Sequence, residues 1–470
     1  MPTVPSLGRS TPLPAELSIP LDRASGEPLA VQIADAVRTA ASTGQLRRGD
    51  RLPSTRTLAT TLGVSRSVTA AAFEQLHAEG WISGRHGSGT YVTTTPPGSP
   101  VTGRHSGQST VDTPGLIDLV PGSPLADGID PAAWRRAWRL ASDVDPLIRP
   151  IGAGLDSYRA VVAEHLLRHR GLVVGGTAVP EDAVLATRGT TAAILEICLA
   201  ILKPGDLVAV EQPGYFRAVG ALQAAGMRVI GVPVDEGGLR VDLVPAEVKA
   251  VYCSPAHHFP LGARMPAARR VALVERARSE NWLIFEDDYD GELRYDVAPL
   301  PLLASLAPDV VVHLGTTSKI VSPTLGVGWM VAPNRVNEPV LELRERTSTA
   351  PSAAGQLVMV GLARTGDLGR HLRRLRRELA ARREVVFAAL TASGVQVDGD
   401  DAGAHVMVPL PSLDREERIV AAARERGLHL AGLAEYYMDA PTQHGIPVSY
   451  AGCTGAQLHT ALPILCELLG

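Results

Sequence analysis

Two apolar segments of this 470-residue chain end in side chains that can do chemistry. Residues 309–319 read Asp-Val-Val-Val-His-Leu-Gly-Thr-Thr-Ser-Lys, an apolar strand that runs into a small polar loop and presents Lys319. A strand buried on both faces can place such a residue with little freedom, which a Schiff-base lysine requires. A second apolar strand, residues 282–286, ends in Asp287 and, two residues later, Tyr289. Lys319 is therefore the first candidate for chemistry.

These three side chains match what pyridoxal phosphate requires of a protein. The cofactor needs a carboxylate on its pyridine nitrogen, which keeps that atom protonated as an electron sink, and a donor on its phenolic oxygen. The two strand ends can supply both, together with the amine. A lysine after a strand is by itself more often a solvated charge, so the hypothesis depends on the combination.

A third strand end offers a place for a phosphate. Residues 183–187 run into Arg-Gly-Thr-Thr and then into a helical pattern, so Gly189, Thr190 and Thr191 fall at a helix N-terminus. Free backbone N–H groups and the positive end of the helix dipole suit a phosphate there. Gly-Thr-Thr alone is a weak signal. Three strand ends in one α/β region are stronger, because ligands of open α/β sheets collect at the carboxyl ends of the strands.

Helical and strand patterns alternate beyond residue 130, which predicts a mostly parallel sheet covered on both faces. An arginine-rich helix at about residues 371–390 then leads to a smaller α/β portion, and we expect its arginines to form a solvated face paired with Glu378 and Glu384. The predicted helices are 130–141, 156–170, 190–202, 216–226 and 267–281, and the predicted strands include 183–187, 207–211, 228–232, 250–253, 282–286, 310–314 and 328–331.

The first 93 residues predict a winged helix-turn-helix. Pro28 opens one helix, Ser54 caps a second, and Ser65 caps a third after a tight Gly63-Val turn. Residues 81–92 then form two short β segments around a glycine-rich tip. Ser65, Arg66 and Ser67 gather at the start of the third helix, where side chains and the helix dipole can meet DNA.

Charge and composition fit a small DNA-binding module on a larger soluble chain. Residues 1–93 hold nine Arg and no Lys against seven acidic residues, while the whole chain has a net charge of −4, which argues against a uniformly basic nucleic-acid surface. For any single arginine a solvated side chain is an equally good interpretation. The four cysteines have no metal-ligand spacing and read as buried free thiols, no metal site is expected, and the absence of a signal peptide or apolar span predicts a cytoplasmic protein without membrane contact.

The chain resembles the MocR subfamily of GntR-type bacterial regulators, a winged helix joined to a fold-type I aminotransferase-like domain. The GntR resemblance lies in Pro28-Leu-Ala-Val-Gln-Ile, Leu52-Pro-Ser-Thr-Arg, Leu62-Gly-Val-Ser-Arg and His86-Gly-Ser-Gly-Thr-Tyr-Val. It implies major-groove and phosphate contacts from Arg56, Ser65, Arg66 and Ser67, and a wing tip of Arg85, His86 and Gly87 at the minor groove. The domain boundaries expected are a disordered tail at 1–19, the winged domain at 20–93, a flexible Pro/Gly/Ser/Thr-rich linker at 94–115 and the aminotransferase-like domain at 116–470.

The aminotransferase resemblance lies in Glu211-Gln-Pro-Gly-Tyr, Ser254-Pro-Ala-His-His-Phe-Pro-Leu-Gly, Glu286-Asp-Asp-Tyr-Asp and Gly315-Thr-Thr-Ser-Lys. It implies that Lys319 forms the internal aldimine, Asp287 pairs with the pyridine nitrogen, and Tyr289 donates to the phenolic oxygen. It further implies a homodimer and these contacts: Tyr215 stacked on the ring, Gly189, Thr190, Thr191 and Thr316 on the phosphate, and Arg217 on an effector carboxylate. His257 lies in the loop near the ring, either in contact with the cofactor or as a hydrogen-bonded loop residue, and a metal site at His257-His258 is less favoured than either.

Three positions depart from the family pattern. Gly326 stands where the family usually has an arginine on the phosphate, and Pro447 where aminotransferases keep the arginine that grips the substrate carboxylate. Arg149 replaces a tyrosine that reaches the partner subunit's cofactor. A lost guanidinium weakens the hold on a dianion, and without a carboxylate grip turnover is not favoured.

The interpretation that follows is a DNA-binding transcriptional regulator that binds pyridoxal phosphate and senses the cofactor, an amine or an amino acid. A regulator that has lost the cofactor and uses the large domain only for dimerisation ranks second. An active aminotransferase with a DNA-binding appendage ranks third, so enzyme activity stays open and is not favoured.

Overall fold

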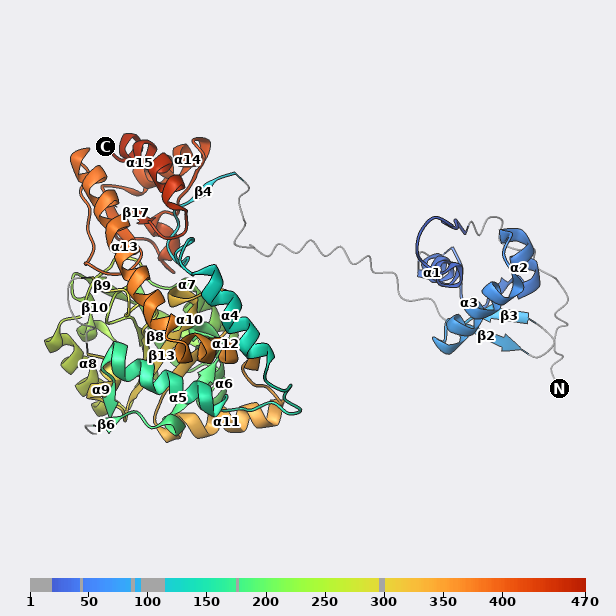
Figure 1. The fold of residues 1–470 in the computed structure, drawn as a ribbon, viewed down its shortest axis with the longest axis horizontal. Coiled ribbons are helices and arrows are strands. Elements are labelled where there is room, and N and C mark those ends of the chain that lie inside the picture. Colours follow the sequence, from blue (N-terminus) through green and yellow to red (C-terminus); the bar gives the residue numbers. More distant parts are fainter. Residues whose placement is uncertain (1–18, 43–44, 86–88, 94–114, 175–176, 296–300) are drawn as a thin grey trace, which may run out of the picture. The chain divides into compact units, whose positions relative to one another are not determined.

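The computed structural model describes residues 19–42, 45–85, 89–93, 115–174, 177–295 and 301–470. The chain divides into two compact units, Met1–Val111 and Asp112–Gly470, each with its own core (Figure 1). The predicted tail and almost all of the predicted linker lie outside the described residues. The fold class predicted from the sequence is confirmed in both units.

Within its described residues, the first unit has three helices and a three-stranded sheet in the order β1-β3-β2. Its core is formed by apolar residues of all three helices and of the wing strands. Ser54 and Ser65 cap α2 and α3 as predicted, since their side chains accept from the N–H groups of Thr57 and Val68. The elements are α1 (Leu29–Ser42), β1 (Arg51–Leu52), α2 (Thr55–Leu62), α3 (Arg66–Ala78), β2 (Ile82–Arg85) and β3 (Gly89–Val92).

The second unit is built on an eight-stranded sheet in the order β10-β9-β8-β11-β12-β13-β14-β7. Four neighbouring pairs, from β9 to β13, are parallel, and β14 runs antiparallel between β13 and β7. The strands are β7 (Val184–Thr187), β8 (Leu207–Gln212), β9 (Arg228–Asp235), β10 (Gly238–Leu239), β11 (Ala250–Cys253), β12 (Leu283–Asp287), β13 (Val311–Thr316) and β14 (Gly328–Val331).

Both faces of this sheet are covered, because alternate strand residues belong to two different apolar cores. Val251 and Ile284 pack with the core that includes α5, α8, α12 and α13, whereas Tyr252 and Phe285 pack with α6, α7 and α11. The helices are α4 (Pro131–Ser142), α5 (Asp156–His165) with a π-turn at Leu166–Arg170, α6 (Thr190–Ile201), α7 (Phe216–Ala224), α8 (Ala267–Ser279), α9 (Leu303–Leu306), α10 (Thr317–Ile320), α11 (Asn334–Thr347) and α12 (Ala353–Arg364).

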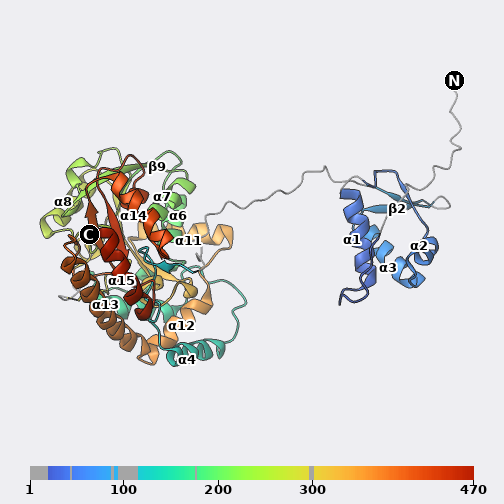
Figure 2. The same ribbon diagram turned by 90° about the horizontal axis from the view of Figure 1, so that it is seen from above.

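A smaller C-terminal portion follows the long helix α13 (Asp367–Ala392), beside which α15 (Gly455–Leu469) packs (Figure 2). Its strands β15 (His405–Leu410) and β17 (His444–Ser449) are antiparallel, and β16 (Leu428–His429) pairs with β4 (Ile117–Asp118). Helix α14 (Leu413–Glu425) completes it. One expectation was wrong: Arg382 of α13 is not solvated but buried, and it donates to the carbonyls of Tyr450 and Cys453 as well as to Glu378.

Candidate functional site: the carboxyl edge of the central sheet

The three predicted strand ends meet at one edge of the sheet. Asp287 ends β12 and lies opposite Leu314 of the parallel strand β13, whose end leads to Lys319. Gly328 of β14 pairs with Thr316 on one side and with Thr187 of β7 on the other. A methyl group on Gly189 would lie 3.9 Å from Thr316 Oγ1. The expected lysine loop and the expected phosphate loop are therefore neighbours.

Lys319 lies in the short helix α10 and is half-buried. Its Nζ donates to the carbonyl of Gly122. Burial lowers the pKa of the ammonium group, while the charges of Asp290 and Asp287 oppose that shift and Arg217 adds to it. A lowered pKa increases the neutral fraction of the amine, and the neutral amine is the nucleophile toward an aldehyde.

Asp287 is buried, and its two oxygens differ. Oδ2 accepts from the hydroxyl of Tyr252 at 2.5 Å, whereas Oδ1 has no hydrogen-bond partner among the described residues. Burial raises the pKa of this carboxyl to about 7. A buried acceptor without a donor costs on the order of 1–3 kcal/mol. A protonated pyridine nitrogen offers one N–H donor, so the residues present fit pyridoxal phosphate.

The loop after β12 is fixed by one buried ion pair and two buried hydrogen bonds between a carboxylate and a histidine, none of which was predicted from the sequence. Asp288 pairs with Arg170 at 2.6 Å, Asp290 lies 2.8 Å from His257 Nδ1, and Glu292 lies 2.8 Å from His165 Nε2. Breaking a buried pair costs about 3–5 kcal/mol. These pairs therefore hold in place the loop that carries Asp287 and Tyr289.

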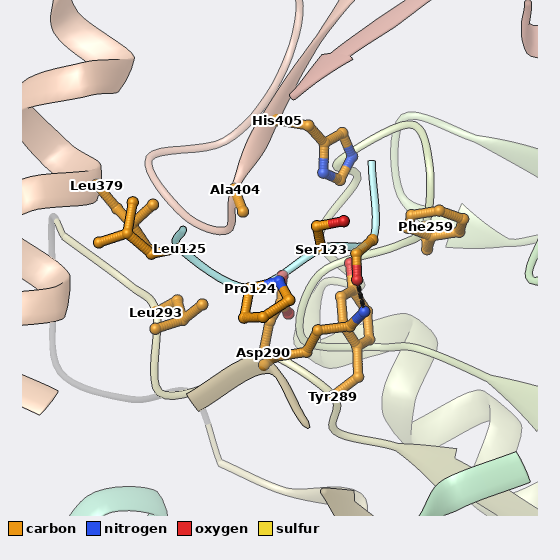
Figure 3. A pocket seen from close by; sticks show the side chains of 12 residues that line it. Ser123, Pro124, Leu125, Phe259, Tyr289, Asp290, Leu293, Leu379, Ala404 and His405 are labelled. Atoms are coloured by element: carbon orange, nitrogen blue, oxygen red, sulfur yellow. Dashed lines mark hydrogen bonds between the residues drawn. The ribbon is translucent and has the colours of Figure 1, made fainter. Parts of the chain in front are cut away.

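Tyr289 lines a small cavity, and His257 lies next to its hydroxyl. The Tyr289 hydroxyl is 3.1 Å from His257 Nδ1, and His257 is buried. Burial raises the pKa of Tyr289 well above its usual range, so the hydroxyl keeps its proton and can donate. Figure 3 shows Tyr289 and Asp290 on one wall of a cavity of about 20 Å³, with Phe259 and His405 across from them.

The predicted phosphate loop is a helix N-terminus without a side-chain cap. Gly189 takes φ 97°, which favours glycine, and precedes α6. Thr191 Oγ1 is 3.4 Å from the hydroxyl of Tyr215, whose ring meets Phe259 edge-on at 5.9 Å. The N–H groups of the first turn of α6 have no side-chain cap, and such groups suit an anion.

The structure describes the three positions at which the sequence departs from the family pattern, Gly326, Pro447 and Arg149. Gly326 ends the turn Pro323–Leu325 with φ 58°, and a methyl group added there would meet nothing within 4 Å. Pro447 lies opposite Met407, which packs in an apolar cluster with Phe259 and Tyr436. None of the residues that line the cavity is an arginine. Arg149 is exposed.

Two arginines that remain near the site are Arg188 and Arg217. Arg188 directly precedes Gly189 and lies 3.9 Å from Glu196, a distance that leaves its guanidinium only weakly engaged. Arg217 is exposed at the start of α7, with its guanidinium over the Phe216 ring, and its charge acts on both Lys319 and Tyr215. Arg188 was not a predicted ligand, although its place before the Gly-Thr-Thr loop was a usable signal.

The predicted DNA-contacting residues that the structure describes lie on α2, at the start of α3 and at the end of β2. Arg56, Ser65, Arg66 and Ser67 are exposed, and among the described residues no acidic side chain pairs with either arginine. Ser65 Oγ and Ser67 Oγ are 2.8 Å apart. Arg85 ends strand β2, and His86 and Gly87 lie outside the described residues.

Arg51, on a strand that pairs with the wing, was not among the DNA-contacting residues predicted from the sequence. It is exposed on the short strand β1, opposite Tyr91 of β3. A side chain at Gly89, which has φ 115°, would approach Arg51 Nε to 2.7 Å. Arg51 therefore adds a positive charge beside the wing, and Gly89 leaves room for it.

Comparison with known proteins identifies both units. The family described as "Bacterial regulatory proteins, gntR family" matches residues 29–92, and "Aminotransferase class I and II" matches residues 127–465. The HTH-type pyridoxine biosynthesis transcriptional regulator PdxR of Corynebacterium glutamicum is 34% identical over 437 residues, covering 92% of this chain and 94% of that protein. The chain belongs to the MocR-type regulators of the GntR family. The probable rhizopine catabolism regulatory protein MocR of Rhizobium meliloti is 29% identical over 459 residues, covering 92% of each chain.

Solved structures similar to the larger unit of this MocR-type regulator are aminotransferases. An archaeal alanine:glyoxylate aminotransferase aligns with TM-score 0.69 at 24% identity, over 75% of this chain and 90% of that one. The Pyrococcus horikoshii kynurenine aminotransferase aligns with TM-score 0.68 at 24% identity, over 77% and 92%. At this identity the likeness establishes the fold. Within the described part of the chain, no helix combines the length and apolar character needed to cross a membrane.

Proposed function

We propose that this MocR-type regulator binds operator DNA as a homodimer and reports pyridoxal phosphate, held covalently at Lys319, to its winged domains. The observation that carries the cofactor assignment is the unpaired buried Oδ1 of Asp287, next to the strand end that leads to Lys319. When bound, the cofactor supplies an aldehyde and an electron-withdrawing ring. Lys319 supplies the amine, Asp287 accepts from the ring nitrogen, and Tyr289 donates to the phenolic oxygen.

Pyridoxal phosphate itself is the effector that we favour. None of the residues that line the cavity is an arginine, so an amino-acid effector would need Arg217, outside that lining, for its carboxylate, and an amine is the next candidate. The Corynebacterium glutamicum relative is named for pyridoxine biosynthesis, which fits a regulator that reports the cofactor supply. A bacterial regulator that binds chromosomal DNA is expected in the cytoplasm.

The leading segment, residues 115–126, offers a physical connection from the lysine toward the N-terminal unit. Its backbone is hydrogen-bonded to the C-terminal portion through Ile117, Leu119 and Ala126. In its middle, Gly122 accepts from Lys319 Nζ. A group that binds Lys319 competes for this contact, so binding at the lysine alters the segment through which the chain continues toward the winged domain.

The test combines two measurements on the purified full-length protein. Added pyridoxal phosphate should produce the visible absorption band that the cofactor acquires when joined to a lysine. It should also change the affinity for a DNA fragment selected from genomic DNA by its binding to the protein. A band without any change in DNA affinity contradicts the sensing mechanism. No band at high cofactor concentration favours the cofactor-free regulator, which the open position at Gly326 also supports.

We expect an exposed apolar loop between α4 and α5 to form part of the dimer interface. Val144, Leu147 and Ile151 are 40–48% exposed and Ile148 is 97% exposed. Such a patch marks a contact surface. We expect Ile148→Asp to weaken self-association by roughly tenfold or more, since a central apolar contact typically contributes about 2 kcal/mol. Sedimentation measures the equilibrium, and Leu243→Asp, at a site 47% exposed elsewhere, is the control. Equal effects of both changes would argue against this surface.

We expect the guanidinium groups of Arg56 and Arg66 to contact operator DNA. Each change to alanine should lower operator affinity by about tenfold, because a good arginine contact to base or phosphate contributes about 1–3 kcal/mol. It should also reduce the salt dependence of binding. Arg38→Ala is the matched control, since that guanidinium is occupied by Asp35 and Glu79. Fluorescence anisotropy at several salt concentrations distinguishes a lost contact from a general loss of positive charge.

A further inference from the structure

Tyr252 is a buried side chain that the proposed function does not yet use. It lies on β11, whose register places it beside Phe285 of β12, two residues before Asp287. Its ring is 1% exposed and packs in the apolar core formed with α6, α7 and α11. Its hydroxyl donates to Asp287 Oδ2 at 2.5 Å. The core fixes the ring, so this polar contact has a fixed direction.

Because of this contact, one oxygen of Asp287 has a hydrogen-bond donor and the other has none among the described residues. Oδ2 is satisfied by Tyr252, and Oδ1 has no partner among the described residues although it is buried. A carboxylate with one oxygen tied by a short hydrogen bond loses its rotational freedom. The second oxygen then has one orientation, which is what an acceptor for a single ring N–H requires.

We infer that Tyr252 is a positioning residue for the cofactor: its hydroxyl holds Asp287 so that Oδ1 faces the pyridine nitrogen. This inference rests on the proposed function, because the pyridine nitrogen belongs to pyridoxal phosphate. Tyr252 touches neither the aldehyde carbon nor Lys319 in this role. It acts through Asp287.

A second consequence is electrostatic. Burial raises the pKa of Asp287 to about 7, and Asp288 and Asp290 push it in the same direction, while the Tyr252 hydrogen bond and Lys319 oppose the shift. Removing the hydroxyl therefore raises the pKa of Asp287 further, so that the carboxyl stays neutral to higher pH. The charged or titratable groups that act on Asp287 from neighbouring elements include Glu211 of β8, Tyr215 before α7, Tyr252 and Cys253 of β11, Asp288, Tyr289 and Asp290 after β12, and Lys319 of α10.

The experiment compares pyridoxal phosphate affinity of the full-length protein and of Tyr252→Phe. We expect about a tenfold loss, since losing an outer hydrogen-bond partner of a binding group typically costs ten- to a hundredfold. The loss should be larger below pH 7 than above it, because the neutral carboxyl is a poorer acceptor for the ring N–H. Tyr158→Phe is the matched control: it also removes a buried hydroxyl, which donates to the Gly328 carbonyl at 2.9 Å rather than to a carboxylate.

Two further measurements test whether Tyr252 acts through Asp287. In a double-mutant cycle with Asp287→Asn, Tyr252→Phe should cause no additional loss of affinity, because it acts through that carboxylate. In the cofactor-free protein, the infrared carboxyl band that Asp287→Asn removes should titrate at higher pH in Tyr252→Phe than in wild type.

Equal losses in both tyrosine variants, additive losses in the cycle, or an unshifted titration would overturn the role of Tyr252 while leaving cofactor binding by wild type intact. Wild-type protein that binds no pyridoxal phosphate would instead overturn the proposed function, and with it the cofactor role of Tyr252.

Discussion

Replacing Lys319 by alanine should abolish the visible absorption band that pyridoxal phosphate gives with the wild-type protein. The lysine is the amine at the site, and burial lowers its pKa, which favours the nucleophilic neutral form. Asp287 and Tyr289 remain in the variant, so some cofactor can still bind without a covalent bond. We therefore expect complete loss of the band together with loss of the cofactor's effect on DNA affinity.

The sequence makes this experiment unusually clean, because the chain contains three lysines, Lys203, Lys249 and Lys319. The other two are exposed, so Lys203→Ala and Lys249→Ala are matched controls that should retain the band. Reduction with borohydride followed by peptide mapping should place the cofactor on residue 319 alone. A band that persists in Lys319→Ala, or label on residue 203 or 249 at equal yield, would contradict the assignment.

The DNA affinity of Lys319→Ala is the second quantity to measure. If Lys319→Ala binds the operator as wild type does without cofactor, and no longer responds to added pyridoxal phosphate, the lysine is needed for signalling rather than for folding. If the variant loses DNA binding altogether, the Lys319–Gly122 contact supports the fold of the leading segment. Thermal unfolding of both proteins separates these cases, because the loss of folding lowers the midpoint and the loss of signalling does not.

The neighbourhood of Lys319, Asp287 and Gly189 was predictable from the sequence because it follows from strand direction. Parallel strands bring their carboxyl ends to one edge, so apolar runs that end in Lys, Asp and Gly-Thr-Thr had to converge. Caps were predictable for a similar reason, since Ser54 and Ser65 act on residues three positions away. Local rules and sheet topology were sufficient for these features.

Contacts made by long side chains between distant segments were not predictable. Arg170 reaches Asp288 across 118 residues, and Arg382 leaves the predicted solvated face of α13 for the carbonyls of Tyr450 and Cys453. Tyr252 meets Asp287 because two strands are in a particular register, which a single sequence does not fix. The identities of the reactive residues are therefore local information, whereas the groups that orient them depend on packing.

A gain of function is expected from Gly326→Arg. Gly326 lies at the end of a short turn, and a Cβ atom added there meets nothing within 4 Å. Its φ of 58° makes any non-glycine residue cost about 1 kcal/mol in folding stability. A guanidinium that reaches the phosphate would form a charge-assisted contact of roughly 1.5–3 kcal/mol, which corresponds to about a ten- to hundredfold gain in cofactor affinity.

Gly326→Gln is the control, because it pays the same backbone cost and offers no charge. Titration of the absorption band with pyridoxal phosphate measures the affinity of wild type and both variants. A gain restricted to the arginine variant means that the phosphate lies within reach of position 326 and that wild type lacks a guanidinium on that side of it. An unchanged affinity contradicts this geometry. If wild type shows no band and Gly326→Arg restores one, the cofactor-free regulator is correct, and the loss of this single guanidinium is sufficient to explain it.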